Sequence, residues 1–385
     1  MMAALHTDVA RRCAGSALAG RAAALLLAAL LAACSSVEKP KPTPLEAFTP
    51  RSGGGVVWQA KLERIDFPLA AAVHGDRVFV AGSDGTVLAL DAASGREHWR
   101  AAVGQPLAAG VGSDGRFTSV VTRGNELVTL EEGRERWRVR LASRVLTAPL
   151  VAGERVFVLA VDRSVHAFDA LDGRRLWTLQ RAGDALTLAQ PGVIVPFHNL
   201  LLVGQGPRLA AVDPLRGTLR WEVPLANPRG TNEVERLADL VGPPVRNADI
   251  VCLRAFQSAV GCIDAARGAL LWSRPVGGQK AVGGDAELLF GADGSDRISA
   301  WRGSGELAWT NERLLHRGLS GALAVGPVVI FGDVEGQVHL LSRDDGQTLL
   351  RLPTDGTPVL GTPVRAGALV LVVTRGGGLF ALRPQ

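Results

Sequence analysis

The sequence predicts an all-β fold, an eight-bladed β-propeller with four antiparallel strands in each blade. Three observations predict it: a tryptophan that recurs at intervals of 37 to 51 residues, a glycine four residues before it, and short apolar strands between Gly- and Asp-rich turns. Such short strands are typical of all-β folds, and a period near 40 residues with four strands is typical of a propeller blade. The recurring tryptophans are Trp58, Trp99, Trp137, Trp177, Trp221, Trp272 and Trp309.

The unit at residues 145–180 shows the four strands most clearly, at 145–151, 155–160, 164–169 and 174–179. Gly173 precedes the last strand, in a turn that needs a positive φ, which β-branched residues resist. We expect Trp177 in that strand to pack between neighbouring blades, with its indole N–H bonded to an adjacent turn. The equivalent glycines of other units are Gly95, Gly133, Gly217, Gly268, Gly305 and Gly346.

The eighth unit is divided between the two ends of the chain. Residues 356–385 contain three strands and stop before a fourth, and residues 55–60 supply one strand with Trp58 in the recurring position. We therefore expect the N-terminal strand to complete the C-terminal blade and close the ring, so that no long edge stays unpaired. The propeller is expected to span residues 56–385, with Leu350 in place of tryptophan in the last copy.

Residues 1–33 are expected to be a lipoprotein signal peptide that is removed. Three arginines precede the apolar run 22–33, which is too short to cross a bilayer as a helix. The run ends in Leu-Ala-Ala-Cys, which resembles a bacterial lipobox and implies lipidation of Cys34; an ordinary cleaved signal is the alternative. Ser35 follows the cysteine, as in lipoproteins that are sorted to the outer membrane, so the sequence resembles theirs at this position. Several acyl chains would make a stable anchor. Residues 34–55, rich in Pro and then Gly, are expected to be a lipidated tether.

Composition and motifs exclude several functions. The formal net charge is +5, but there is no block of five or more Lys and Arg, so nucleic acid is not an expected partner. No metal-binding His pair, nucleophile elbow or P-loop is present, so we predict no catalytic, metal or cofactor site. Cys252 and Cys262 lie symmetrically about Gln257 on a predicted hairpin. They are either a disulfide of an oxidising compartment or two small buried hydrophobes.

The phrase that ends at each tryptophan, such as residues 91–99, resembles the tryptophan-docking repeat of the pyrroloquinoline-quinone alcohol dehydrogenases. Those enzymes are also eight-bladed and have a calcium site, a catalytic Asp and vicinal cysteines. This chain has no Cys-Cys pair, and its copies keep Gly and Trp while the leading Asp drifts. We therefore interpret the phrase as a structural blade joint. A quinoprotein dehydrogenase stays one alternative, and a glycan-binding propeller with exposed aromatics such as Trp301 in its central funnel is another.

Function is expected where the repeat is interrupted. The longest spacing, from Trp221 to Trp272, contains the insertion 226–244, and insertions in a repeat often lie on a binding face. The connection before it places Leu186 and Leu188 on one side of an extended segment. The structural alternatives are a cap packed on the ring for the insertion and a buried first strand for residues 185–189.

Four phrases, together with the lipobox and the eight blades, resemble the BamB family, the propeller lipoproteins of the outer-membrane β-barrel assembly machine. They are ALTLAQ (185–190), GTNEVERLADL (230–240), NERLLHRGL (311–319) and FGDVEGQVHLLS (331–342). The resemblance covers the whole mature chain. The chain departs from the family pattern at Ala189, where an Arg is expected, and at Val241, where an acid is expected.

The resemblance implies a scaffold without enzymatic activity or cofactor, anchored by lipid in the outer membrane and facing the periplasm. It implies that the chain binds the periplasmic POTRA domains of the barrel-forming subunit and aids insertion of outer-membrane proteins, whose unfolded chains would be a second kind of partner. The partner-binding residues that it implies are Leu186, Leu188, Arg236 and Asp239.

Overall fold

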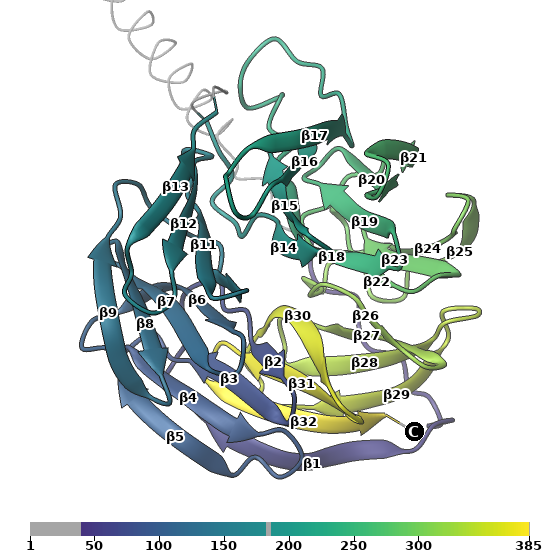
Figure 1. Ribbon diagram of the computed structural model, residues 1–385. Helices are drawn as coiled ribbons and strands as arrows, with labels where there is room; N and C mark the ends of the chain where they lie inside the picture. Colours follow the sequence, from purple (N-terminus) through teal and green to yellow (C-terminus); the bar gives the residue numbers. More distant parts are fainter. Residues whose placement is uncertain (1–39, 182–185, 385) are drawn as a thin grey trace, which may run out of the picture. The chain divides into compact units, whose positions relative to one another are not determined.

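The computed structural model describes residues 40–181 and 186–384. Residues 42–385 form one compact unit, a ring of eight four-stranded antiparallel sheets, as the sequence predicted (Figure 1). In this described part no helix is long and apolar enough to span a membrane.

The first four blades follow one another along the chain, each running from the axis of the ring outward. Blade 1 has β2 (Ala72–His74), β3 (Arg77–Ala81), β4 (Thr86–Asp91) and β5 (Glu97–Ala102). Blade 2 has β6 (Leu107–Ser113), β7 (Phe117–Thr122), β8 (Glu126–Glu131) and β9 (Arg134–Arg140). Blade 3 has β10 (Leu150–Ala152), β11 (Arg155–Leu159), β12 (Val165–Asp169) and β13 (Arg175–Leu179). Blade 4 has β14 (Ile194–Phe197), β15 (Leu200–Gln205), β16 (Arg208–Val212) and β17 (Leu219–Pro224).

The next three blades repeat this order, and the eighth is shared between the chain ends. Blade 5 has β18 (Leu240–Asn247), β19 (Ile250–Ala255), β20 (Ala259–Asp264) and β21 (Ala269–Arg274). Blade 6 has β22 (Gly283–Gly284), β23 (Leu288–Ala292), β24 (Ile298–Arg302) and β25 (Leu307–Asn311). Blade 7 has β26 (Leu323–Val325), β27 (Val328–Gly332), β28 (Gln337–Ser342) and β29 (Thr348–Pro353). Blade 8 has β30 (Val359–Ala366), β31 (Leu369–Thr374), β32 (Gly378–Pro384) and the N-terminal β1 (Gly54–Lys61).

The core lies between adjacent blades. In blade 1, strands β3 and β4 are buried almost throughout, whereas the outermost strand β5 is mostly exposed. Both faces of the inner strands pack on neighbouring sheets, so their sequences are continuous apolar runs rather than alternating ones. The largest buried cluster extends across blades 8, 1 and 2 and includes Leu379, Val80 and Val128.

Each joint between blades packs a tryptophan of one blade on the recurring glycine of the next. The seven glycines have φ between +65° and +78°. A Cβ added to any of them would lie only 2.6 to 3.1 Å from an atom of the indole. Glycine is therefore required both by its backbone conformation and by its neighbour. Five of the seven indoles donate N–H bonds of 2.8 to 3.0 Å to the next blade: those of Trp58, Trp137, Trp177, Trp272 and Trp309.

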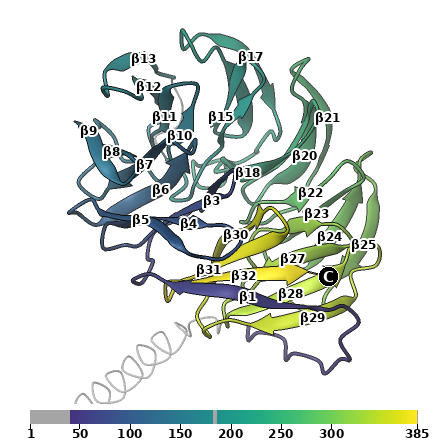
Figure 2. The same cartoon turned by 60° about the horizontal axis from the view of Figure 1, so that its bottom comes forward.

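The ring closes through β1, which pairs antiparallel with β32 along its whole length (Figure 2). This strand makes blade 8 complete, as the sequence predicted. Leu350 of β29 occupies the tryptophan position of blade 7, and its side chain reaches Gly54 at the start of β1. The eighth joint therefore also packs an apolar side chain on a glycine, but Gly54 has a φ of +140°, outside the range of the other seven glycines.

The segment before β1 is attached to the ring over part of its length. Thr43 and Arg51 donate backbone N–H bonds of 3.0 and 2.9 Å to Leu315 and to Leu349 in β29. The side chain of Leu45 packs on the core between blades 6 and 7. The sequence suggested a tether over residues 34–55; residues 34–39 lie outside the described residues, whereas 43–51 follow the outer strand of blade 7.

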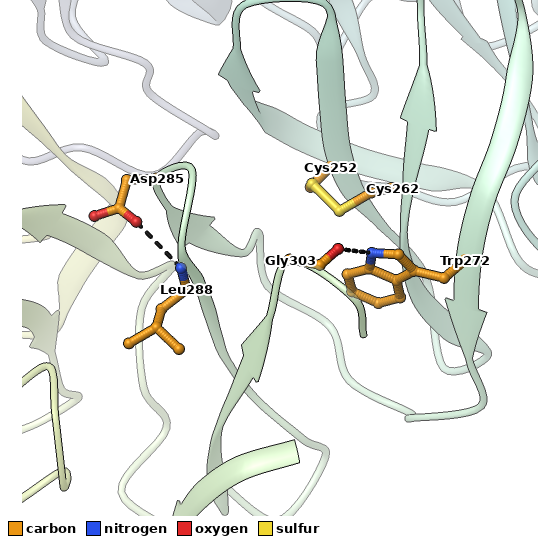
Figure 3. The surroundings of a disulfide bond; sticks show 6 residues. All are labelled: Cys252, Cys262, Trp272, Asp285, Leu288 and Gly303. Carbon is orange, nitrogen blue, oxygen red and sulfur yellow. Dashed lines mark hydrogen bonds between the residues drawn. A yellow bond between two sulfur atoms is a disulfide. The ribbon is translucent and has the colours of Figure 1, made fainter. Parts of the chain in front are cut away.

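Blade 5 contains a disulfide between Cys252 and Cys262 (Figure 3). The two residues are directly opposite each other on β19 and β20, with Cα atoms 4.0 Å apart. They are buried beside Trp301 in the core between blades 5 and 6. Trp272 of the same blade donates its indole N–H to Gly303 at 2.9 Å, which fastens blade 5 to blade 6.

Candidate partner-binding face

All four predicted partner-binding residues lie at one end of the ring. Because every blade has four antiparallel strands, the connections between blades fall at the same end as the turns between second and third strands. We call this end the connection face and the opposite end, which contains the tryptophan joints, the hairpin face. Leu186 and Leu188 lie between β13 and β14, and Arg236 and Asp239 lie between β17 and β18.

The two leucines differ in exposure. Leu186 is 37% exposed, whereas Leu188 is half-buried and lines a small cavity of about 50 Å³ with Leu159 and Leu240. Neither residue is in a strand. The segment therefore presents one apolar side chain to solvent and inserts another toward the ring.

Asp239 holds this leucine segment in place. Its Oδ2 accepts the backbone N–H of Leu188 at 2.8 Å, and its Oδ1 accepts an N–H of Arg163 at 3.2 Å. The backbone oxygen of Arg163 in turn accepts an N–H of the Gln205 side chain at 3.2 Å. Both carboxylate oxygens of Asp239 thus have partners inside the protein, so its local role is to position the leucine segment.

The insertion between β17 and β18 forms a single helix-like turn rather than a helix. Glu235 accepts the backbone N–H of Thr231 at 2.8 Å, and its own N–H donates to Asn232 Oδ1 at 2.9 Å. This pattern resembles a capping box, except that Glu235 accepts the N–H of Thr231 rather than that of Asn232. The N–H of Thr231 is the main cause of the lowered pKa of Glu235. Arg236 is half-buried, and its guanidinium lies 3.5 Å from the Gly230 oxygen.

The same turn exposes an apolar residue that sequence reasoning did not select. Val234 is 71% exposed, the largest value among the exposed apolar side chains of the described chain.

The two positions at which the chain departs from the family pattern differ in exposure. Ala189 is exposed, whereas Val241 is only 3% exposed. A side chain at position 241 faces the core, so in this chain the position offers nothing to a partner.

The last two family-like phrases meet in a buried charge network. Asp333 Oδ2 accepts N–H bonds from Arg317 Nε at 2.8 Å and His339 Nε2 at 2.9 Å. All three residues are at most 2% exposed. A second N–H of Arg317 donates to the Thr43 oxygen at 2.9 Å, so the network also fastens the segment before β1.

Burial and hydrogen bonds set the charges of this network. Burial alone would raise the pKa of Asp333, but bonds from His339, the Gln337 N–H and Arg317 outweigh it and lower that pKa. Burial lowers the pKa of His339 despite the nearby carboxylate. A charged imidazole would leave a buried Nδ1–H without an acceptor, because Nδ1 has no partner in this structure. The network is thus a structural ion pair with a neutral histidine.

The axis of the ring is hollow, with cavities of about 490 and 390 Å³. Of the described residues that line them, Phe67 is the only aromatic, and it is 6% exposed. Trp301, whose direction the sequence left open, is 3% exposed between blades 5 and 6 and does not reach the funnel. A glycan-binding funnel therefore lacks its expected aromatic platform in this part of the chain. Within residues 40–181 and 186–384 no cluster of three His, Cys, Asp or Glu side chains could hold a metal ion.

Solved structures of two different kinds of protein share the propeller fold of this chain. The solved structure of BamB from Moraxella catarrhalis has a TM-score of 0.78, with 22% identity over 86% of this chain and 100% of that chain. Quinohemoprotein alcohol dehydrogenase from Comamonas testosteroni has a TM-score of 0.66, with 14% identity over 86% of this chain and 76% of that chain. At these identities both likenesses show the shared propeller fold alone.

Sequence relatives are more specific. The outer membrane protein assembly factor BamB of Burkholderia pseudomallei is 34% identical over 371 residues, 94% of this chain and 97% of that protein. The one of Bordetella pertussis is 33% identical over 354 residues, 91% of this chain and 92% of that protein. The family model described as outer membrane protein assembly factor BamB matches residues 44–109, 83–311 and 302–384. The chain therefore belongs to the family of the outer membrane protein assembly factor BamB, a family of assembly factors and not of enzymes.

Proposed function

We propose that this chain is a lipid-anchored scaffold that binds the periplasmic POTRA domains of the barrel-forming subunit through its connection face. In this way it aids the insertion of outer-membrane proteins. The observation that supports the interface most is Leu186, an exposed apolar side chain on a segment that Asp239 and Arg163 hold in place. A few apolar anchors on a pre-ordered surface usually supply most of an interface's binding energy.

The four predicted residues have different roles in this interface. Leu186 makes the apolar contact, and the exposed Val234 on the neighbouring insertion extends it. Asp239 acts from within, because it fixes the backbone of Leu188 at 2.8 Å. Arg236 is half-buried at the same turn and provides the polar margin of the contact.

The test is co-purification of the full-length lipoprotein with the barrel-forming subunit from detergent-solubilised envelopes. Leu186→Asp, alone and with Leu188→Asp, should abolish co-purification, because a charge in an apolar contact is desolvated without a partner. The matched control is Leu215→Asp, which changes a 62% exposed leucine on the hairpin face and should co-purify normally. Circular dichroism should show the same β-rich spectrum for all variants. Retained binding by the Leu186 variants would exclude this interface.

The lipid anchor is proposed on the lipobox at Cys34, which lies outside the described residues. Cys34→Ala should remove incorporation of radiolabelled palmitate and should leave the unprocessed precursor as the main product. Palmitate labelling of the variant at the wild-type level would contradict lipidation at Cys34.

A further inference from the structure

The mouth of the central channel on the connection face is ringed by cations from distant parts of the chain. A cavity of about 390 Å³ there is lined by Arg64, Lys280 and Arg375. Arg64 follows β1, Lys280 lies between blades 5 and 6, and Arg375 lies in the turn between β31 and β32. The fold therefore brings together three basic side chains that no sequence motif connects.

None of these three cations is hydrogen-bonded or ion-paired to a carboxylate of the described chain. In the described part of the chain, none of the three side chains makes a hydrogen bond or an ion pair. The one carboxylate that lines the cavity is Asp66, which already pairs with Arg123 at 2.7 Å and with Ser83. Many other arginines of the chain have carboxylate partners, as Arg138 has at 2.8 Å. Lys280 and Arg375 also line an adjoining cavity of about 290 Å³ with Asp293 and Asp296. The mouth itself has three cations and one carboxylate, which is already paired.

Lys280 lies at the centre of the charges around the mouth. Its side chain is open to solvent but lies inside the concave mouth among protein atoms. Burial in this concavity lowers the pKa of Lys280; attraction from Asp296 opposes the shift, and the smaller repulsion from Arg375 adds to it. Asp296 lies in the turn between β23 and β24 and accepts the backbone N–H groups of Gly318 and Leu319, at 2.6 and 3.0 Å, so it fastens the connection between blades 6 and 7.

The channel below the mouth does not add negative charge. Its cavity of about 490 Å³ shares Pro68, Leu69 and Gly361 with the upper one, and no carboxylate is among the described residues that line it. The cations at its other end, Arg246 and Arg365, donate to backbone carbonyls at 3.3 and 3.1 Å. The basic mouth consequently opens on a largely apolar shaft that has two arginines at its far end and no carboxylate among its described lining residues.

We propose that the mouth of the central channel binds a phosphate-bearing anion, with Arg64, Lys280 and Arg375 as its ligands. The cavity of about 390 Å³ falls in the usual size range of small-molecule sites. Guanidinium forks match phosphate oxygens, and lysine adds a point charge. A phosphate has several oxygens and can accept from more than one cation at once, whereas a single carboxylate neutralises only one. The phosphate belongs to either a free small molecule or a lipid headgroup that enters the shaft with its apolar part.

The test uses the full-length protein in neutral detergent and isothermal titration calorimetry. The probes are inorganic pyrophosphate and dihexanoyl phosphatidylglycerol. Arg64→Gln, Lys280→Gln and Arg375→Gln together should lower the affinity for pyrophosphate at least tenfold. Because the three side chains have no partners within the described protein, the triple variant should keep the wild-type melting temperature. The matched control, Arg96→Gln with Arg216→Gln and Arg302→Gln, removes three exposed cations in or next to turns of the hairpin face and should stay within twofold of wild type.

The two probes distinguish the sources of phosphate. Tighter binding of the lipid than of pyrophosphate, lost in the mouth variant, supports a headgroup that uses the apolar shaft. Binding of pyrophosphate alone supports a free phosphate ligand. The proposal is overturned if neither probe binds wild type saturably, or if the mouth variant and its control lose affinity equally.

Discussion

The recurring glycine must adopt a positive φ and must leave room for the indole of the neighbouring blade. Two glycines of blade 3 distinguish these two requirements. Gly173 and Gly153 both have positive φ, +75° and +58°. A Cβ on Gly153 would meet nothing within 4 Å, whereas one on Gly173 would lie 2.6 Å from the Trp137 indole. Gly153→Ala should therefore lower the free energy of unfolding by about 1 kcal/mol, the cost of a left-handed backbone at alanine. Gly173→Ala also overpacks the joint, so its total cost should be roughly 2–4 kcal/mol.

Urea unfolding followed by tryptophan fluorescence and circular dichroism measures this difference. The unfolding midpoint of Gly173→Ala should fall clearly below that of Gly153→Ala. Restoring space with Trp137→Leu in the Gly173→Ala background should recover part of the loss relative to Trp137→Leu alone. Equal costs for the two glycine variants would mean that the indole contact contributes nothing beyond the turn.

What the sequence could predict of single residues depends on how local their partners are. The conformation of Gly173 follows from its own turn, and the tryptophan contact follows from the repeat. The role of Asp239 does not, because its partners Leu188 and Arg163 are 51 and 76 residues away in sequence. A polar residue in an insertion is compatible with facing a partner or with holding a neighbouring segment, and only the fold decides between them.

At the scale of elements, blade 5 is cross-linked through its two central strands. The disulfide joins β19 and β20 across a sequence separation of 10 residues. Closing a loop of this size in the unfolded chain is worth about 2–3 kcal/mol of stability in the chain-entropy view. Protein refolded with a reductant present should therefore have a free energy of unfolding that is lower by this amount, and it should unfold at a lower urea concentration.

The matched variant for this prediction is Cys252→Ala with Cys262→Ala. It should lose the same stability and a further amount for the space left beside Trp301, since both cysteines are at most 7% exposed. Its unfolding midpoint should not respond to reductant. A wild-type midpoint that is also insensitive to reductant would show that the bond does not form.

The segment before β1 shows where element-level prediction from sequence ends. Proline and then glycine dominate residues 34–55, with no apolar periodicity, and this composition is typical of a tether. Its attachment depends on single contacts: backbone bonds from Thr43 and Arg51, and the ring of Phe48 under the Arg351 guanidinium at 5.0 Å. Such contacts have no sequence period, so they become visible only when blades 6 and 7 are assembled.

In the molecule as a whole, the closing strand β1 differs from the other outer strands because no turn joins it covalently to the strand it pairs with. The outer strand β5 is joined to β4 by a short turn, whereas β1 is held to β32 only by non-covalent contacts across the two ends of the chain. Detachment of β1 would expose the edge of blade 8 and undo the Trp58–Gly95 joint with blade 1. The stability of the ring should therefore depend more on β1 than on β5.

Proline at equivalent positions tests this dependence. Gln59 and Arg100 are both exposed, each follows its tryptophan, and they pair with Phe380 and Leu88 respectively. Proline in a strand removes a backbone donor, and where that donor is used the partner left unsatisfied costs about 1–3 kcal/mol. Arg100→Pro should stay near or below this cost because β5 remains tethered to its blade. Gln59→Pro should cost more and should lower the urea dependence of unfolding, because an opened ring already exposes surface before the main transition. Equal midpoints and equal slopes for the two variants would show that ring closure through β1 adds no stability beyond that of an ordinary outer strand.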